Sequence, residues 1–501
     1  MKISRIPVMI LLLASCFSAQ GQPEPEDMLD EFIQRGMQDW KVPGLSALVV
    51  KEGQVVFKKA YGVKDIVSQE PVDSETTFNM ASTTKAIVAI CLAMLVDEGM
   101  IQWNDPVKKH YPAFDLSDPY IRADARVQDL LTHNLGMGNA DALWIFDSLS
   151  TDETLERFAA YEPNYPLRGG FVYQNIMYAI AGKLIEEVSG KHWTEFVRDR
   201  VFEPLGMSRT VARSPEIFEK GNYVTPHWDD SEDGVVRVPY TLFDNVGAAG
   251  ILWSCIDDMA RYMTFLQSRG VVEGDTLLLP STFDYLFKPH SFVTAEQFYP
   301  TQELTKPRWT TYGLGWFQHD YRGEKLNFHT GSIAGLVALA AFIPERNIGL
   351  YVFANLDHAE LRHAIMYKAL DLYLFGDDGR DWHQEIFDLY RGFKQDRIAE
   401  EQALVASRIP ATAPLVALDS LAGTYMHERL GTVAVRVKGE ELEVQVNGKP
   451  AKIAKHWHHN VFRTEKDPRW RNRTLINFRL GGDGRVADLV YGSTEGFRRQ
   501  P

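Results

Sequence analysis

The sequence predicts an α+β protein that is followed by a small, separate β module. Two observations indicate the first part: an antiparallel hairpin at 45–61 precedes a helix at 85–96 that is apolar on all sides. A helix of that kind must be buried on all sides. A third observation indicates the module, because apolar and polar side chains alternate beyond Leu421 as they do in half-buried strands. A chain of 501 residues has enough material for two or more domains.

Charge and composition narrow the class of protein. The formal net charge is −14 and no basic run is present, so we expect no nucleic-acid partner. His456, His458 and His459 lie close together, but no cysteine or carboxylate stands at ligand spacing. We interpret them as a solvated strand end, and we expect neither a metal nor a cofactor.

The first 21 residues have the pattern of an export signal. Lys2 and Arg5 are followed by an apolar stretch at 6–14 and by small residues at 19–21, which predicts a signal peptide over 1–21. A second ending is also open, because the segment 13–16 (LASC) resembles a bacterial lipobox that would place a lipid anchor on Cys16. Both endings predict an exported protein that is periplasmic, secreted or tethered to a membrane as a lipoprotein. No second apolar span of about twenty residues follows, so we expect no integral membrane domain.

The remaining elements follow from periodicity and turn residues. A helix at 28–40 comes before the hairpin, so the order is not the strand, elbow and helix of an α/β hydrolase, and no G-x-S-x-G motif is present. The chain continues with expected helices at 176–188, 193–202, 256–267, 358–373 and 385–406, and with expected strands at 312–316, 336–343 and 348–354. A short Pro-rich linker at 410–414 leads into the β module.

Ser82 and Lys85 are the first candidate catalytic pair. They are three residues apart at the start of the buried helix, which places both side chains on one helical face. A serine hydroxyl becomes a good nucleophile when a neighbouring base takes its proton, and a buried lysine loses basicity and can be that base. The alternative interpretation is structural: Ser82 caps the helix and Lys85 reaches solvent.

Two further segments contain candidate site residues. Tyr173 and Asn175 precede a packed helix, where a phenol can pass a proton and an amide can hold both a lysine and a substrate carbonyl. The alternative for this pair is an aromatic core residue and an asparagine N-cap. His329 ends a strand and is on its own more typical of a hydrogen-bonded histidine. The segment 247–252 is interpreted as purely structural.

Together, three motifs resemble one known family. Ser82-Thr83-Thr84-Lys85, Tyr173-Gln174-Asn175 and His329-Thr330-Gly331, in this order and spacing, resemble the serine β-lactamase and penicillin-binding protein superfamily, especially its class C and DD-peptidase branch. The resemblance implies a central antiparallel sheet flanked by helices, beside an all-helical subdomain. It implies a hydrolase domain at 27–375, a helical linker at 376–415 and, from a weaker likeness, a C-terminal lipocalin-like β domain, barrel-like, at 416–501.

The resemblance also implies roles for individual residues. Ser82 would be the acylated nucleophile, and either Lys85 or Tyr173 would be the base, with Tyr173 protonating the leaving group. Asn175 would hold the substrate amide. The oxyanion hole would consist of the backbone N–H groups of Ser82 and Ser332. His329 and Thr330 would face the carboxylate side of the substrate, and Gly331 would be a further substrate-binding residue.

The third motif departs from the pattern of β-lactamases, which have Lys where this chain has His329. A neutral imidazole is a weaker carboxylate anchor than an ammonium group. We therefore expect an exported serine hydrolase that acts on D-amino-acid peptides, amides or esters, including cell-wall fragments, more as a DD-carboxypeptidase or esterase than as an efficient β-lactamase. The alternative is a penicillin-binding sensor or scaffold that acylates slowly without turnover. The oligomeric state is left open.

Overall fold

A computed structural model gives the fold for residues 24–145, 149–377, 379–494 and 496–500. The predicted signal segment at 1–21, including Cys16, lies outside these residues. Within them, no helix has both the length and the apolar character that are needed to cross a membrane.

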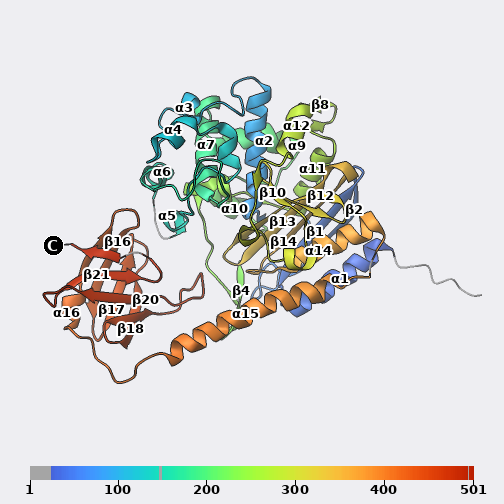
Figure 1. Cartoon of the computed structure of the whole chain (residues 1–501). Coiled ribbons are helices and arrows are strands. Elements are labelled where there is room, and N and C mark those ends of the chain that lie inside the picture. The colour runs from blue at the N-terminus through green and yellow to red at the C-terminus, as the bar shows by residue number, and fades with distance from the viewer. Residues whose placement is uncertain (1–23, 146–148, 378, 495, 501) are drawn as a thin grey trace, which may run out of the picture.

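The centre of the structure is an antiparallel sheet of eight strands (Figure 1). The two predicted hairpin strands form one edge, and the strand with the third motif lies inside. The strand order is β2 (Gln54–Gly62), β1 (Gly44–Lys51), β14 (Ile348–Ala354), β13 (Leu336–Ile343), β12 (Glu324–Ile333), β11 (Phe317–Tyr321), β10 (Thr310–Tyr312) and β9 (Ser291–Phe292). The central antiparallel sheet that the family resemblance implied is confirmed.

Helices cover both faces of this sheet. On one face, α1 (Pro25–Trp40) and α14 (Leu361–Leu370) pack against Ala47 and Val49 of β1. On the other face, α2 (Thr84–Asp97) and α11 (Ile256–Gln267) share a core with Leu48 and Val50. Successive side chains of a strand point to opposite faces, so the run of apolar residues in β1 serves both layers.

The helix α2 runs between the sheet and a lobe of mostly helical segments (Figure 1). Every residue from Thr84 to Leu95 is buried, as the all-round apolar pattern predicts. The lobe contains α3 (Val107–His110), α4 (Pro119–Asp124), η2 (Val127–Leu131), α5 (Ala142–Ile145), α6 (Thr151–Ala159), α7 (Asn175–Ser189) and α8 (Trp193–Val197). Shorter elements outside it include α9 (Glu203–Leu205), α10 (Ser214–Lys220), α12 (Pro280–Leu286), α13 (Gln302–Thr305) and the hairpin of β4 (His227–Asp230) and β5 (Gly234–Arg237).

One predicted strand is wrong. Residues 313–316, which we expected to continue a strand from Tyr312, form the tight connection between β10 and β11. Gly315 has a φ of +85°, a conformation that side chains other than glycine rarely adopt. The two glycines of the YGLGW segment therefore mark a turn, and the strands lie on either side of it.

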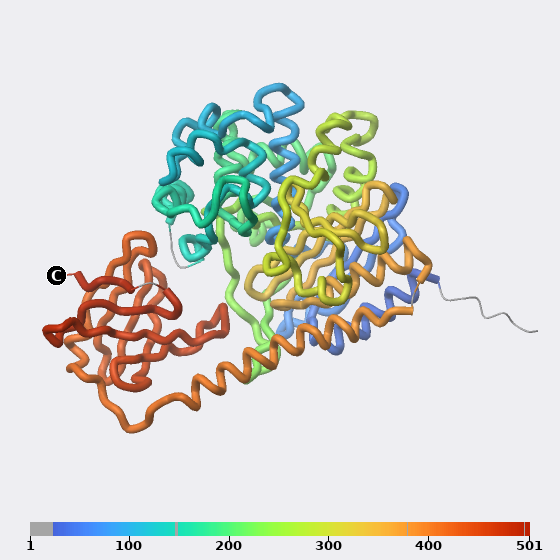
Figure 2. Tube along the Cα trace, in the orientation of Figure 1, coloured from blue at the N-terminus to red at the C-terminus, as the bar shows by residue number. Residues whose placement is uncertain are grey.

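The C-terminal module is a closed antiparallel barrel in which each strand pairs with the next, the up-and-down arrangement of lipocalins. Its strands are β15 (Gly423–His427), β16 (Gly431–Lys438), β17 (Glu441–Val446), β18 (Lys452–His458), β19 (Val461–Thr464), β20 (Leu475–Leu480), β21 (Val486–Tyr491) and β22 (Gly496–Arg499). The helix α15 (Trp382–Ala406) leads to it from beside α1 and α14. Figure 2 shows a loop of the barrel that extends back toward the β4–β5 hairpin.

Candidate active site

Ser82 lies in a single turn of 3₁₀ helix, η1 (Ala81–Thr83), immediately before α2. The alternative that Ser82 only caps the helix is wrong, because no described side chain caps α2. Asn79 accepts a hydrogen bond from the Ala81 N–H at 2.8 Å. The turn is held against β12 at Gly331. A Cβ atom there would come within 2.2 Å of the Met80 carbonyl oxygen and 3.0 Å of the Ser82 nitrogen, so only glycine permits this approach.

The Lys85 amine is surrounded by three oxygen atoms. Its Nζ lies 3.0 Å from Ser82 Oγ, 2.8 Å from Asn175 Oδ1 and 2.7 Å from the carbonyl oxygen of Ala249. Both carbonyl oxygens can only accept, so they take two N–H groups of the amine. When the amine is neutral, its remaining tetrahedral direction is the lone pair, and that direction faces the serine hydroxyl.

Burial sets the protonation state of Lys85. The side chain is fully buried, and desolvation lowers the pKa of its ammonium group from 10.5 to about 7, against a smaller opposing effect of the Asp141 carboxylate. Neutral and charged forms are therefore both well populated at pH 7. The interpretation of Lys85 as a surface residue is wrong, and its environment is that of a base for Ser82.

Asn175 is fixed by contacts on both ends of its amide. Its Oδ1 accepts from Lys85, and its Nδ2 donates to Asp141 Oδ1 at 3.1 Å. It is not the N-cap of α7, because the Gln174 side chain accepts from the Ile176 N–H at 3.2 Å and fills that role. Since Asp141 can only accept, the amide oxygen must face the lysine.

Tyr173 brings its phenol to the same place from a distant segment. The Lys85 Nζ lies 5.0 Å from the centre of its ring, and the ring of His133 packs against it with centroids 4.3 Å apart. Desolvation raises the pKa of the phenol well above 10, and the neighbouring Ser82 hydroxyl offsets this only in part. The phenol oxygen is buried without a hydrogen-bond partner among the described residues. Tyr173 is therefore a neutral O–H at pH 7 and is able to donate a proton.

His329 does not take the position that we expected. It is only 1% exposed, its Nδ1 donates to its neighbour's carbonyl, Thr330 O, at 2.6 Å, and its Nε2 accepts from the Tyr312 hydroxyl at 3.0 Å. Burial lowers the pKa of its imidazole to about 3, so it is neutral. Thr330 is also turned inward, and its hydroxyl pairs with Tyr299 at 2.7 Å. Neither side chain is placed to bind a substrate carboxylate, because both are used to hold the aromatic core behind β12.

The peptide between Gly331 and Ser332 is held from behind by Arg362. This arginine is buried, pairs with Glu360 at 2.9 Å and donates to the Gly331 carbonyl oxygen. The peptide is trans, so its Ser332 N–H points away from that carbonyl. Ser332 itself is exposed and lines the same pocket as Ser82. This orientation suits an oxyanion-hole donor, and Arg362 polarises the peptide that carries it.

The pocket in front of Ser82 has a volume of about 190 Å³. Its wall is mainly apolar, and none of its lining residues is a lysine or an arginine. The lining residues are Ala81, Ser82, Trp144, Asn175, Phe243, Val246, Ala249, Gly250, Ser332, Ile333, Ala334, Asp357, His358 and Trp470. Asp357 forms an ion pair with His358 and raises the pKa of that imidazole, so the pair adds no net positive charge.

Sequence reasoning missed several of these contributors. The segment 247–252 supplies the Ala249 carbonyl that orients Lys85, although its sequence indicates only structure. Trp144 lies in the short helix α5, and Asp141 and Phe243 lie outside the helices and strands, all in segments without a recognisable motif. Trp470 comes from the barrel. One sequence feature could have pointed to the surroundings of Tyr173, namely the HNLGMG segment that follows Thr132. Its His133, which has a φ of +56°, accepts a hydrogen bond from the Gln174 N–H and thereby positions Tyr173.

Comparison with known proteins gives matches over most of the chain. The model of the Beta-lactamase family matches residues 29–374, and a domain of unknown function (DUF3471) matches 407–498. Among curated proteins, the chain is 26% identical over 432 residues to the unguisins hydrolase ungD of Aspergillus violaceofuscus, covering 79% of this chain and 73% of the relative. It is 24% identical over 343 residues to the protein flp of Staphylococcus aureus, covering 67% and 64%.

Among solved structures, the chain is similar to the octameric penicillin-binding protein homologue from Pyrococcus abyssi. The TM-score is 0.60 at 24% identity, and the match covers 94% of this chain and 99% of the other, so the likeness extends over both the hydrolase domain and the barrel. The chain belongs to the Beta-lactamase family. Within that family it is a serine hydrolase. Its Ser82, Lys85 and Tyr173 side chains lie close together.

Proposed function

We propose that this protein forms an acyl-enzyme at Ser82 and hydrolyses amides or esters, including D-amino-acid peptides whose reacting end is uncharged. The observation that carries the proposal is the Lys85 amine, which has two N–H groups committed to carbonyl oxygens and its third direction on Ser82 Oγ at 3.0 Å. A neutral amine held in that orientation is a general base for the hydroxyl.

The acylation step follows from the positions of the groups. Lys85 takes the proton as Ser82 Oγ attacks the substrate carbonyl. The oxyanion that forms is stabilised by the backbone N–H groups of Ser82 and Ser332. Tyr173, which is a neutral phenol, donates its proton to the leaving nitrogen or oxygen and recovers one from the lysine ammonium. Water then releases the acyl group by the reverse sequence.

The charge of the pocket favours one group of substrates. Among the described residues, no lysine or arginine lines it. His329 is neutral and buried, and the His358 imidazole, whose pKa is raised, is paired with the Asp357 carboxylate. A substrate carboxylate would be desolvated there without a cation. This supports esters and amides with uncharged ends over DD-carboxypeptidase substrates and β-lactams, both of which carry a carboxylate.

A substrate panel tests the proposal. Purified protein without residues 1–21 is assayed on 4-nitrophenyl acetate, on D-alanine 4-nitroanilide, on a peptide with a free D-Ala-D-Ala end and on a chromogenic cephalosporin, with Ser82→Ala as the control. We expect turnover of the first two, little of the others, and none by Ser82→Ala. Equal turnover by Ser82→Ala would overturn the proposal, and a single burst of one equivalent would instead identify the slowly acylating binding protein.

Export is part of the proposal and is supported by the charge and apolar pattern of residues 2–21. The mass of the mature protein, purified from a bacterial host, tests it. Loss of the leader supports export, and a diacylglycerol mass on Cys16 would identify the lipoprotein ending. A full-length protein in the cytoplasmic fraction would contradict export.

A further inference from the structure

One wall of the Ser82 pocket does not belong to the hydrolase domain. Trp470 lines this pocket together with Trp144 and Phe243, yet it lies in the loop between β19 and β20 of the barrel. This loop, residues 465–474, is the part of the barrel that reaches toward the β4–β5 hairpin (Figure 2). A side chain from the second domain is therefore part of the wall in front of the nucleophile.

The loop has a defined shape. Asp467 is buried, and its carboxylate accepts from the backbone N–H groups of Arg469 and Trp470 at 2.8 and 2.9 Å. The backbone of Asp467 also forms two hydrogen bonds: its N–H donates to the Asn472 carbonyl, and its carbonyl accepts from the Arg471 N–H. Although burial alone would raise it, the pKa of the Asp467 carboxyl is lowered, because Lys452 and these N–H groups stabilise its charge. The turn thus fixes the direction of the indole relative to the barrel.

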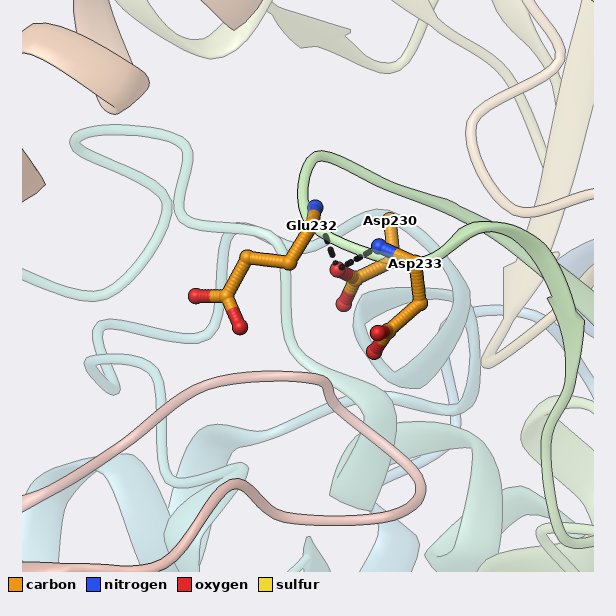
Figure 3. Close-up of side chains that lie close together, drawn as sticks. All are labelled: Asp230, Glu232 and Asp233. Carbon is orange, nitrogen blue, oxygen red and sulfur yellow. Dashed lines mark hydrogen bonds between the residues drawn. The ribbon is translucent and has the colours of Figure 1, made fainter.

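Ion pairs fasten the loop to the hydrolase domain. The tip of the β4–β5 hairpin presents Asp230, Glu232 and Asp233, whose carboxylates lie close together (Figure 3). Lys466 contacts all three, at 3.0, 2.7 and 3.4 Å. Arg471 pairs with Asp230 at 2.9 Å and also with Asp233.

Arg473 completes the connection through a two-pronged pair with Glu232 at 2.9 and 3.1 Å. This arginine and Lys466 lower the pKa of Glu232 to about 2. A cluster of three carboxylates could also be considered as a metal site, but each of them is already bound by a cation of the barrel loop. The cluster is explained as the anchor of that loop.

We propose that Trp470 is a specificity-determining residue that limits the Ser82 pocket to short, uncharged acyl groups, an inference that rests on the proposed function. The pocket of about 190 Å³ is smaller than the roughly 300–1,000 Å³ of common ligand sites. Its apolar wall favours uncharged groups, and the Trp470 indole is part of the wall that bounds the pocket. Removal of the indole leaves the Ser82, Lys85 and Tyr173 arrangement untouched and lengthens the space in front of it.

The experiment compares acyl chains of increasing length. The 4-nitrophenyl esters of acetate, butyrate and octanoate are assayed with the full mature chain, with Trp470→Ala and with Asn472→Ala, an exposed neighbour in the same loop that does not line the pocket. We expect Trp470→Ala to raise kcat/KM for the octanoate ester about tenfold or more and to change that for acetate less than threefold. Asn472→Ala should behave like the parent protein.

A second variant keeps the result independent of how well Trp470→Ala folds. Arg473→Glu repels Glu232 and loosens the loop, so it should raise octanoate turnover as well, and it should add nothing in the Trp470→Ala background because both changes act through the same indole. An unchanged ratio of octanoate to acetate turnover in both single variants overturns the proposal. Absence of all ester turnover in the parent protein would instead reject the proposed function.

Discussion

Replacing the buried lysine should remove the base and, with it, a desolvation term that destabilises the folded protein. Desolvation lowers the pKa of Lys85 from 10.5 to about 7, which at about 1.4 kcal/mol per pH unit corresponds to a destabilisation of about 5 kcal/mol below pH 7. Lys85→Met removes this term but leaves Asn175 Oδ1 and Ala249 O without their donor, at a cost of about 1–3 kcal/mol each. The two costs total about 2–6 kcal/mol, so the net change at pH 6.5 lies between a loss of about 1 kcal/mol and a gain of about 3 kcal/mol.

The change of this stability difference with pH is a more decisive test than its size at one pH. Unfolded Lys85 keeps its proton up to pH 10.5, whereas the folded protein releases it near pH 7, so the parent protein gains stability as pH rises between these values. The methionine variant lacks this titration. The stability of Lys85→Met relative to the parent protein should thus fall by about 1.4 kcal/mol for each pH unit from about 7.5 to 9.5.

Urea unfolding followed by near-ultraviolet circular dichroism measures this difference at each pH. Lys183→Met is the matched control, because Lys183 lies at the surface beside Asp152 and Glu186 and its pKa is raised, so both its folded and unfolded forms stay charged in this range. Its stability difference should be flat from pH 7.5 to 9.5. A flat difference for Lys85→Met as well would refute the depressed pKa on which the proposed base depends.

Three further outcomes test neighbouring groups. Tyr173→Phe should lower turnover of an anilide by about 10²–10⁴-fold and that of a 4-nitrophenyl ester by less than tenfold, because nitrophenolate leaves without a proton; equal losses would exclude Tyr173 as the acid. Asp141→Asn removes the carboxylate that raises the Lys85 pKa, so the acidic limb of the pH–rate profile should move to lower pH; an upward shift would contradict this. Arg362→Lys keeps the charge beside Glu360 but loses the contact with Gly331 O, and we expect kcat to fall about tenfold or more at constant KM; a rise in KM alone would assign Arg362 to ground-state binding instead.

Local sequence patterns predicted the elements whose environment is uniform. The helix α2 is buried on all sides, and its sequence is correspondingly apolar on all sides. The strands β13 and β14 begin and end where their apolar runs begin and end. The barrel strands β16, β17 and β20 follow the period-two alternation. Where glycines interrupted a run, as in 313–316, periodicity alone could not separate a strand from the turn that joins two strands.

The sequence predicted only those site residues that belong to a recognisable motif. Ser82 and Lys85 are close in sequence, so helical spacing predicted that they lie together. Tyr173 was a candidate because it precedes a packed helix, but its placement beside Ser82 depended on the family resemblance. His329 turned inward because Tyr312, on a neighbouring part of the sheet, offers it a partner that no local pattern reveals. Trp470 could not be found from the sequence, because its position depends on ion pairs between two domains.

The most direct test of the account is the rate at which a fluorophosphonate labels the protein between pH 5.5 and 9, with the labelled residue identified by peptide mass spectrometry. The account predicts a single adduct on Ser82 that forms up to about tenfold faster per pH unit below pH 7 and at a constant rate well above it, as Lys85 loses its proton. An adduct on another residue, or a rate on Ser82 that does not change with pH, would contradict it.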